Sequence, residues 1–348
     1  MAKVLVTGAS GFIGSKLTER LVANGDDVTC LVRNPGKAAA LEQMGARLAP
    51  GDIRNVEAVR SAVSEHEVVY HLAGIVMAFR RQEMTATNVT AFRNLAAACA
   101  DRVTPPTLVY VSSLAAAGPS SVDRPRIESD PPAPVSIYGW SKRTAELIAE
   151  EYAGRVPITV VRPPIVFGEG DKNMRSLFRS VFRLGIHMAL GVAYSRYSLI
   201  HVSDLVDALV LCADRGARLS PTGHYPASTD TCASPSAPSG YYFAAGDEQP
   251  TFAELGSLIG VALGRARVRI CRSSGTLLLW PIAAAAELGA RLRGQPYIFN
   301  FDKAREARAG SWTCSSQAIR AQCGFAPHAS LVERLRQTAH WYVQQKLL

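Results

Sequence analysis

A glycine-rich turn between a short apolar segment and a helical pattern places the strongest constraint on how this chain folds. Residues 3–6 have the apolar, β-branched character of a buried strand, and TGASGFIG follows at 7–14, with Gly8, Gly11 and Gly14 evenly spaced before a helical pattern over 12–22. Glycines permit a tight turn and a close approach of the backbone to a phosphate, and the helix N-terminus offers unpaired N–H groups. The turn therefore predicts a dinucleotide-binding unit.

The rest of the first half continues this alternation. Apolar segments at 28–32, 68–71, 108–111 and 158–161 are separated by helical patterns at 37–44, 85–100 and 138–152. Such a pattern is typical of an α/β fold with a doubly wound, Rossmann-type parallel sheet. We predict a dinucleotide-binding domain at 1–165, to which 198–214 return, and a second, smaller α/β lobe at 166–348 that binds substrate.

Composition narrows the class of ligand. The 348 residues are 48% hydrophobic and carry a net charge of +9, which attracts anions. The basic residues are scattered and no nucleic-acid-binding motif is present, so a phosphate-bearing small molecule is favoured over nucleic acid. The seven cysteines include no C-x-x-C pair, so we predict neither a disulfide framework nor a metal site. Free cysteines fit a reducing compartment, and we therefore predict a cytoplasmic location. The apolar stretch 276–292 is too short for a stable membrane span, which leaves peripheral association open.

The end of the second predicted strand indicates the cofactor. An NAD-binding fold usually offers a carboxylate to the adenosine ribose there, but this chain has Arg33, no carboxylate between 28 and 41, and a second cation at Lys37. These charges favour the 2′-phosphate of NADP(H), with NAD(H) as the alternative cofactor. The alternative interpretation is that both side chains are merely solvated.

Three polar residues form a candidate catalytic set. Ser113 ends the predicted strand LVYVSS, and YGWSK places Tyr138 and Lys142 at i and i+4, on one face of a helix. A phenol becomes an effective acid or base near neutral pH when an adjacent ammonium lowers its pKa. We expect Tyr138 to carry a proton, Lys142 to lower the pKa of Tyr138, and Ser113 to hold the substrate oxygen. A chance pair on a helix surface is the alternative.

Several motifs together resemble the extended short-chain dehydrogenases/reductases, the NAD-dependent epimerase/dehydratase-type family that includes 3β-hydroxysteroid dehydrogenases and dihydroflavonol reductases. The motifs are TGASGFIG at 7–14, GDIR at 51–54, HLAG at 71–74, TNVTAFRNL at 87–95, YGWSK at 138–142, RPPIVFGEGD at 162–171 and IHVSDL at 200–205. The resemblance covers the whole chain. It departs from the family pattern at Ala91 and Phe92, where Gly-Thr is usual.

The resemblance also implies further contacts and an assembly. It implies a homodimer that pairs the helices at 85–100 and 138–152. The implied cofactor contacts, to which Arg33 and Lys37 are added, are Gly8, Ser10, Gly11, Phe12, Ile13, Gly14, Asp52, Ile53, Leu72, Ala73, Gly74, Asn88, Val111, Tyr138, Lys142 and Pro163.

The segment after the last predicted strand indicates the substrate. Sugar-nucleotide epimerases of this family typically have R-Y-F-N there, whose amide meets a diphosphate, whereas this chain has RPPI at 162–165. We therefore predict an NADP-dependent oxidoreductase that acts on a carbonyl or secondary alcohol of a lipophilic molecule. The predicted substrate contacts are Met77, Leu114, Pro164, Arg196 and Trp280.

A nucleotide-sugar epimerase with tightly held NAD(P) is the runner-up, because Arg196 lies near where an epimerase places a diphosphate-binding arginine. A cofactor-sensing module without catalysis is disfavoured by the presence of both Tyr138 and Lys142. A 4,6-dehydratase is disfavoured because no acid follows Ser113.

Overall fold

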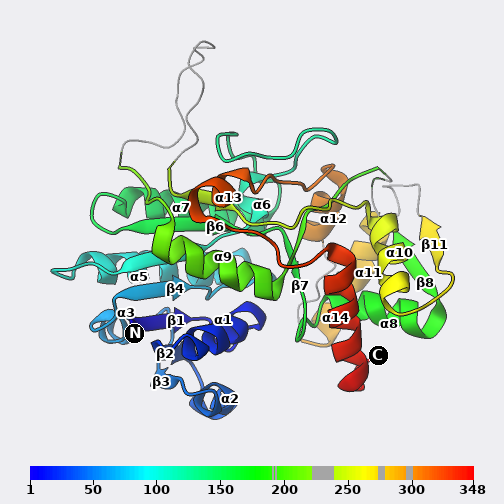
Figure 1. The fold of residues 1–348 in the computed structure, drawn as a ribbon. Helices are drawn as coiled ribbons and strands as arrows, with labels where there is room; N and C mark the ends of the chain where they lie inside the picture. The colour runs from blue at the N-terminus through cyan, green and yellow to red at the C-terminus, as the bar shows by residue number, and fades with distance from the viewer. Residues whose placement is uncertain (190–191, 193, 222–238, 273–278, 295–300) are drawn as a thin grey trace.

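The fold is described from a computed structural model, shown in Figure 1. It describes residues 1–189, 192, 194–221, 239–272, 279–294 and 301–348.

A parallel sheet of seven strands forms the centre of the larger part of the molecule. Its strands are β1 (Lys3–Thr7), β2 (Asp27–Val32), β3 (Arg47–Pro50), β4 (Val68–His71), β5 (Thr107–Val111), β6 (Ile158–Arg162) and β10 (Tyr241–Phe243). The strand order is β10-β6-β5-β4-β1-β2-β3, with β1 paired to both β2 and β4. The order reverses between β1 and β4, and ligands of open α/β sheets bind at such a switch point.

Helices cover both faces of this sheet (Figure 1). One face packs against helices that contribute Leu17, Leu209 and Ile319 to the core, and the other against helices that contribute Val59, Phe92 and Ile148. The first group is α1 (Phe12–Ala23), α2 (Ala39–Gln43), α9 (Val202–Arg215) and α13 (Gln317–Cys323); the second is α3 (Val56–Val63), α5 (Ala91–Ala100) and α7 (Ile137–Tyr152). Shorter turns are η1 (Pro35–Lys37), α4 (Arg81–Thr85), η2 (Ala86–Thr90) and α6 (Leu114–Ala117).

A smaller part of the molecule has two short parallel sheets and a core of its own. In it β7 (Ile165–Phe167) pairs with β9 (Leu199–His201), and β8 (Ile186–Ala189) pairs with β11 (Arg269–Arg272). Its helices are α8 (Met174–Leu184), α10 (Phe252–Ala262), α11 (Leu279–Leu292), α12 (Phe301–Arg308) and α14 (Leu331–Gln344). Phe178, Leu255 and Leu335 are buried together between α8, α10 and α14.

The structure confirms the predicted doubly wound α/β fold and adds details that the sequence did not reveal. Residues 198–214 divide between the two parts, because α9 packs on α1 whereas β9 pairs with β7. The edge strand β10 comes from far along the chain, and the helix predicted at 85–100 is interrupted by the π-helical turn η2. Most of the predicted loop at 229–240 lies outside the described residues.

Among the described residues, no helix has both the length and the apolar character needed to cross a membrane.

Candidate active site

The predicted phosphate-binding turn lies between β1 and α1. Gly8 has φ +77°, and a Cβ atom there would come within 2.6 Å of the Ala73 backbone nitrogen. A Cβ atom on Gly14 would come within 2.2 Å of the Gly8 carbonyl oxygen, so both positions require glycine. Gly11 is the N-cap of α1 and provides no side-chain cap, which leaves backbone N–H groups at the helix N-terminus for an anion. Ser10, Phe12 and Ile13 complete this turn, with Ser10 exposed.

The cations predicted to meet the ribose phosphate lie beyond β2, where Arg33 and Lys37 are both exposed. Asp52 follows β3 and accepts two side-chain hydrogen bonds from Arg54, at 3.0 and 2.6 Å. The hydrogen bond from Arg54 lowers the pKa of Asp52 to about 2, with a smaller contribution from the charge of Arg33. Arg54 is thus a third cation at this edge, and its two-residue spacing from Asp52 was visible in the sequence. Ile53, between them, is buried.

The loop after β4, with Leu72, Ala73 and Gly74, is tied to α7 through Asn88. The amide of Asn88 accepts a hydrogen bond from the Ile75 N–H at 2.8 Å and donates to the Ile75 carbonyl at 2.9 Å. Its nitrogen also lies 3.0 Å from the Ser141 hydroxyl. Asn88 therefore positions this loop through its side chain.

Ser113 and Tyr138 lie together at the carboxyl edge of the sheet. Ser113 is the N-cap of α6, and its hydroxyl accepts a hydrogen bond from the Ala115 N–H at 3.1 Å, which leaves the O–H proton available for donation. The Ser113 side chain lies close enough to Tyr138, in the first turn of α7, to lower the pKa of the phenol. Two members of the predicted catalytic set, Ser113 and Tyr138, are thus close to each other.

Lys142 lies one turn further along α7 and is buried. Its ammonium donates a hydrogen bond to the Val111 carbonyl at 2.7 Å and lies 4.4 Å from the centre of the Tyr110 ring. Burial lowers the pKa of Lys142 to about 7.

The expectation that Lys142 lowers the pKa of Tyr138 is wrong for this arrangement. Burial raises the pKa of Tyr138 to about 12, the hydrogen bond from Ser113 lowers it only in part, and the charge of Glu306 raises it further. The ammonium of Lys142 is instead directed at the end of β5. Tyr138 is therefore a protonated phenol at neutral pH.

A helix from the smaller part of the molecule covers the beginning of α7. The carboxylate of Asp302, on α12, accepts hydrogen bonds from the backbone N–H groups of Ile137 at 2.8 Å and Tyr138 at 3.1 Å. Ser136 caps the same helix by accepting from the Gly139 N–H at 2.9 Å. An anion at a helix N-terminus is stabilised by unpaired N–H groups and by the helix dipole. No pattern in the sequence indicated this role of Asp302.

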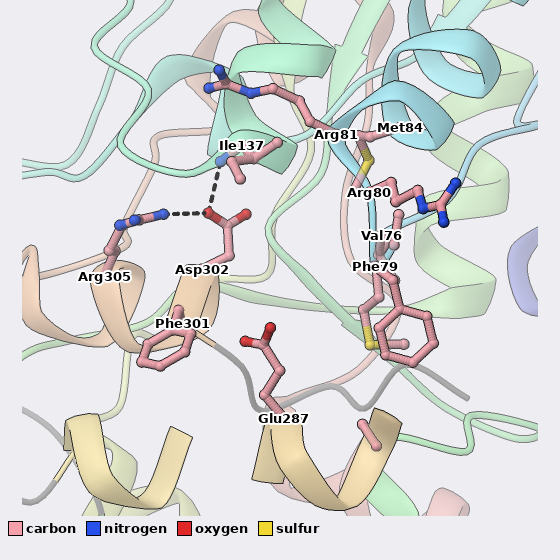
Figure 2. A pocket seen from close by; sticks show the side chains of 13 residues that line it. Val76, Phe79, Arg80, Arg81, Met84, Ile137, Glu287, Phe301, Asp302 and Arg305 are labelled. Atoms are coloured by element: carbon pink, nitrogen blue, oxygen red, sulfur yellow. Dashed lines mark hydrogen bonds and ion pairs between the residues drawn. The ribbon is translucent and has the colours of Figure 1, made fainter. Parts of the chain in front are cut away.

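A cavity of about 260 Å³ lies beside this junction. Figure 2 shows Asp302 directed at Ile137 and Arg305 on one side, with Val76 and Phe79 opposite and Glu287 rising from α11. Eight of its thirteen lining residues are apolar or alanine. The lining residues are Val76, Met77, Ala78, Phe79, Arg80, Arg81, Met84, Ile137, Glu287, Ala290, Phe301, Asp302 and Arg305.

The predicted substrate residues are distributed unevenly around this space. Met77 lines the cavity, and Trp280 lines a neighbouring one together with Val135 and Ala309. Leu114 and Pro164 line neither of the two cavities, although Leu114 is held near the site by its N–H bond to the Pro163 carbonyl at 2.9 Å. Arg196 donates to the Gln249 carbonyl at 2.9 Å and also lines neither.

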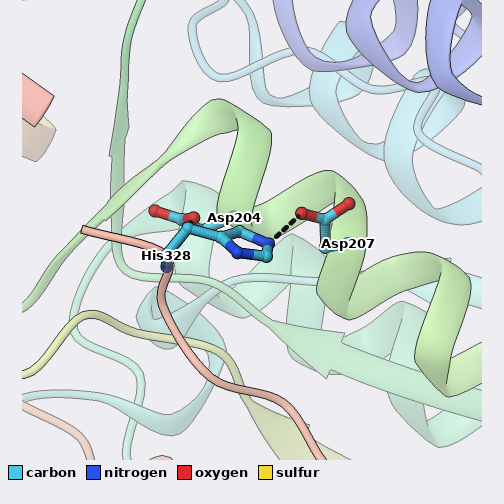
Figure 3. Close-up of side chains that lie close together, drawn as sticks. All are labelled: Asp204, Asp207 and His328. Atoms are coloured by element: carbon cyan, nitrogen blue, oxygen red, sulfur yellow. Dashed lines mark hydrogen bonds and ion pairs between the residues drawn. The ribbon is translucent and has the colours of Figure 1, made fainter. Parts of the chain in front are cut away.

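One cluster among the described residues has the side chains of a metal site, namely Asp204, Asp207 and His328 (Figure 3). Asp204 accepts hydrogen bonds from the Arg334 guanidinium, and Asp207 forms an ion pair with Arg20 at 2.7 Å. His328 lies 2.8 Å from Asp207. The two arginines balance both carboxylates, so the cluster is explained as a link between α9 and the carboxyl-terminal segment.

Comparison with known proteins gives matches over most of the chain. The profile of the NAD dependent epimerase/dehydratase family matches residues 4–226. Ceramide reductase from Caulobacter vibrioides is 27% identical over 339 residues, which are 97% of this chain and 94% of that protein. Sterol demethylase protein B from Methylococcus capsulatus is 28% identical over 62% of this chain, and UDP-glucose 4-epimerase from Vibrio cholerae is 30% identical over 61% of it. Each of these two matches spans 66% of the relative, just under two thirds of its length.

Solved structures resemble the whole chain. UDP-glucose 4-epimerase from Thermotoga maritima with UDP-glucose has a TM-score of 0.75 at 19% identity, covering 99% of both chains. UDP-glucuronic acid 4-epimerase from Bacillus cereus, in complex with UDP-glucuronic acid and NAD, has a TM-score of 0.73 at 18% identity, again covering 99% of both. At these identities the likeness shows the fold alone.

Proposed function

Since the chain belongs to the NAD dependent epimerase/dehydratase family, we propose that it is an NADP(H)-dependent oxidoreductase that reduces a carbonyl group of a lipophilic small molecule or oxidises the matching secondary alcohol. The observation that carries the proposal is that Ser113 and Tyr138 lie together at the carboxyl edge of the sheet, beside a cavity that Ile137 and mostly apolar residues line.

The residues of the turn between β1 and α1 fit a dinucleotide. Gly8 and Gly14 keep the backbone compact there, and the uncapped N-terminus of α1 suits a pyrophosphate. When bound, the cofactor supplies or accepts a hydride. Arg33 and Lys37 would meet the ribose phosphate.

The side chains of the site have separate tasks in the proposed reduction. Tyr138 donates its phenolic proton to the carbonyl oxygen as hydride arrives at carbon, and the resulting tyrosinate takes a proton back from solvent. Ser113 donates a hydrogen bond to the same oxygen, because accepting the Ala115 N–H does not use its hydroxyl proton. Lys142 would hold the cofactor ribose.

The apolar and alanine residues of the cavity, which outnumber its five charged side chains, support a lipophilic substrate. One relative matched over nearly its full length is a ceramide reductase, which also favours reduction of a lipophilic ketone. Epimerisation of a nucleotide sugar is the second candidate, because the family and the matched relatives include epimerases.

The purified full-length chain should be assayed with NADPH and NADH against medium-chain ketones, oxosteroids and UDP-sugars. We expect NADPH consumption with at least one hydrophobic ketone. Interconversion of a UDP-sugar pair without net cofactor turnover, together with no activity on the hydrophobic compounds, would establish the epimerase instead.

A further inference from the structure

Helix α12 directs a pair of charged side chains toward Tyr138, in addition to the capping Asp302. The ammonium of Lys303 lies 5.9 Å from the centre of the Tyr138 ring. The same ammonium forms an ion pair with Oε2 of Glu306 at 2.6 Å. Because Lys303 and Glu306 are three residues apart, both project from one side of α12. The ion pair therefore lies against the side chain that we propose as the proton donor.

The second oxygen of Glu306 has no hydrogen-bond partner among the residues that the structure describes. Its Oε1 atom is buried and accepts no hydrogen bond from any of them, whereas Oε2 is bound by Lys303. A buried carboxylate oxygen without a donor is unfavourable, because it has lost the water molecules that would solvate it. This feature of α12 calls for a donor that the described residues do not supply.

The apolar surroundings of Glu306 make a hydrogen bond to its Oε1 atom selective for ligands that carry a donor. Tyr138 and Ala309 pack with Trp312 in an apolar cluster. The indole N–H of Trp312 donates to the backbone carbonyl of Glu306 at 2.9 Å, which fixes this turn of the chain. A hydrogen bond to a carboxylate is stronger where water is excluded, and a site built for a donor rejects a ligand that lacks it.

We propose that Oε1 of Glu306 accepts a hydrogen bond from a hydroxyl or amide N–H group on the carbon next to the reacting carbonyl, so that the enzyme selects donor-bearing ketones within the lipophilic class. This inference rests on the proposed function only in taking Tyr138 as the group that meets the carbonyl oxygen. Glu306 is then a specificity-determining residue, and Lys303 holds its carboxylate in place.

The test uses two matched ligands: a medium-chain ketone with an acetamido group on the carbon next to the carbonyl, and the same ketone without it. Their dissociation constants are measured by calorimetry on the full-length protein with NADP+ present. The variants are Glu306→Gln, which keeps a weaker, neutral acceptor, and Glu306→Ala, which removes it. Glu287→Gln, which neutralises a carboxylate that lines the neighbouring cavity, is the matched control.

We expect the wild-type protein to bind the acetamido ketone about tenfold or more tightly than the plain ketone. This preference should shrink in Glu306→Gln, disappear in Glu306→Ala and persist in Glu287→Gln. Using the ratio of the two constants cancels any general weakening of the site, and NADP+ affinity reports whether each variant is folded.

The inference is overturned if the wild-type protein shows no preference, if both Glu306 variants keep it, or if it is lost in Glu287→Gln instead. Turnover of the same ketones with NADPH is measured separately. Absence of turnover in the wild-type protein would reject the proposed function, while the binding ratios would still decide the role of Glu306.

Discussion

The carboxylate of Asp302 accepts a hydrogen bond from the backbone N–H of Tyr138 at 3.1 Å, although the two residues are 164 positions apart in the chain. The contact joins α12 to the first turn of α7, the helix that carries the proposed proton donor. The smaller part of the molecule therefore helps to fix the position of Tyr138.

Replacing Asp302 should loosen this junction. Asp302→Ala removes the acceptor for two backbone N–H groups and should lower the free energy of unfolding by about 1–2 kcal/mol. Asp302→Asn should lower the free energy of unfolding less, because the amide oxygen still accepts a hydrogen bond from the backbone N–H groups. Denaturant unfolding measures both variants, with the exposed Asp123→Ala as the control. Equal stability of Asp302→Ala and the wild-type protein would contradict a capping role.

Replacing the phenol of Tyr138 should reduce turnover far more than it weakens cofactor binding. Tyr138→Phe removes the proton but leaves the glycine turn and Lys142 intact, so turnover should fall by about 10²–10⁴-fold. The dissociation constant of the cofactor should stay close to that of the wild-type enzyme. Steady-state kinetics and cofactor titration check this, with Tyr152→Phe on the same helix as the control. Turnover near the wild-type value would exclude Tyr138 as the proton donor.

The sequence predicts those parts of the site that one segment specifies. Gly8 and Gly14 lie in a single turn, and Tyr138 and Lys142 lie on one helix, so spacing alone indicates their arrangement. The structure brings Ser113 to Tyr138 because Ser113 follows β5 at the carboxyl edge of the sheet, where the first turn of α7 also lies.

Contacts between distant segments carry no such local signal. Asp302 and Glu306 reach Tyr138 only because α12 folds back over α7, and strand β10 joins β6 although α8 and α9 lie between them in the chain. The spacing of Tyr138 and Lys142 in the sequence also does not show which acceptor the buried ammonium of Lys142 binds. Lys142 bonds to the Val111 carbonyl, and for this reason its predicted effect on Tyr138 was wrong.

Glu128 should make stability depend on pH. Burial raises its pKa from 4.5 to about 7, even though its Oε1 accepts the Phe243 N–H at 2.9 Å. Between these values the folded protein holds a proton that the unfolded chain has released. The stabilisation is therefore present below the unfolded pKa and is lost as pH rises through the folded one.

Glu128→Gln stays neutral at every pH and avoids this loss. The variant should gain thermal stability relative to the wild-type protein between about pH 5 and about pH 8, as melting curves at both values would show. The exposed Glu42→Gln serves as the control. A constant difference in melting temperature across this range would contradict the assignment.

The predicted homodimer needs an apolar surface on its paired helices. Phe92 and Ile148 are buried in the core and cannot supply it, whereas Trp140 and Leu147 on α7 are 55% and 45% exposed. Leu147→Glu should therefore convert a dimer to a monomer in light scattering at micromolar concentration. Leu288→Glu, exposed on another helix, should leave the mass unchanged. A monomeric wild-type protein would contradict the prediction.

The last prediction concerns the choice between NADP(H) and NAD(H). The carboxylate of Asp52 is ionised but bound on both oxygens by Arg54, so Arg33 and Lys37 remain exposed to meet a 2′-phosphate. One charge-assisted hydrogen bond contributes about 1.5–3 kcal/mol, which corresponds to about tenfold or more in affinity. Arg33→Ala should weaken NADP+ binding by this factor and change NAD+ binding little.

Titration of both cofactors, at low and at high salt, measures the effect. Salt should weaken the binding of NADP+ more than that of NAD+, because the additional contact that the 2′-phosphate makes with Arg33 is between exposed charges. Arg60→Ala on α3 provides a control for the loss of one positive charge elsewhere on the surface. If the wild-type protein binds NAD+ as tightly as NADP+, or if Arg33→Ala keeps the wild-type ratio, these cations do not select the cofactor.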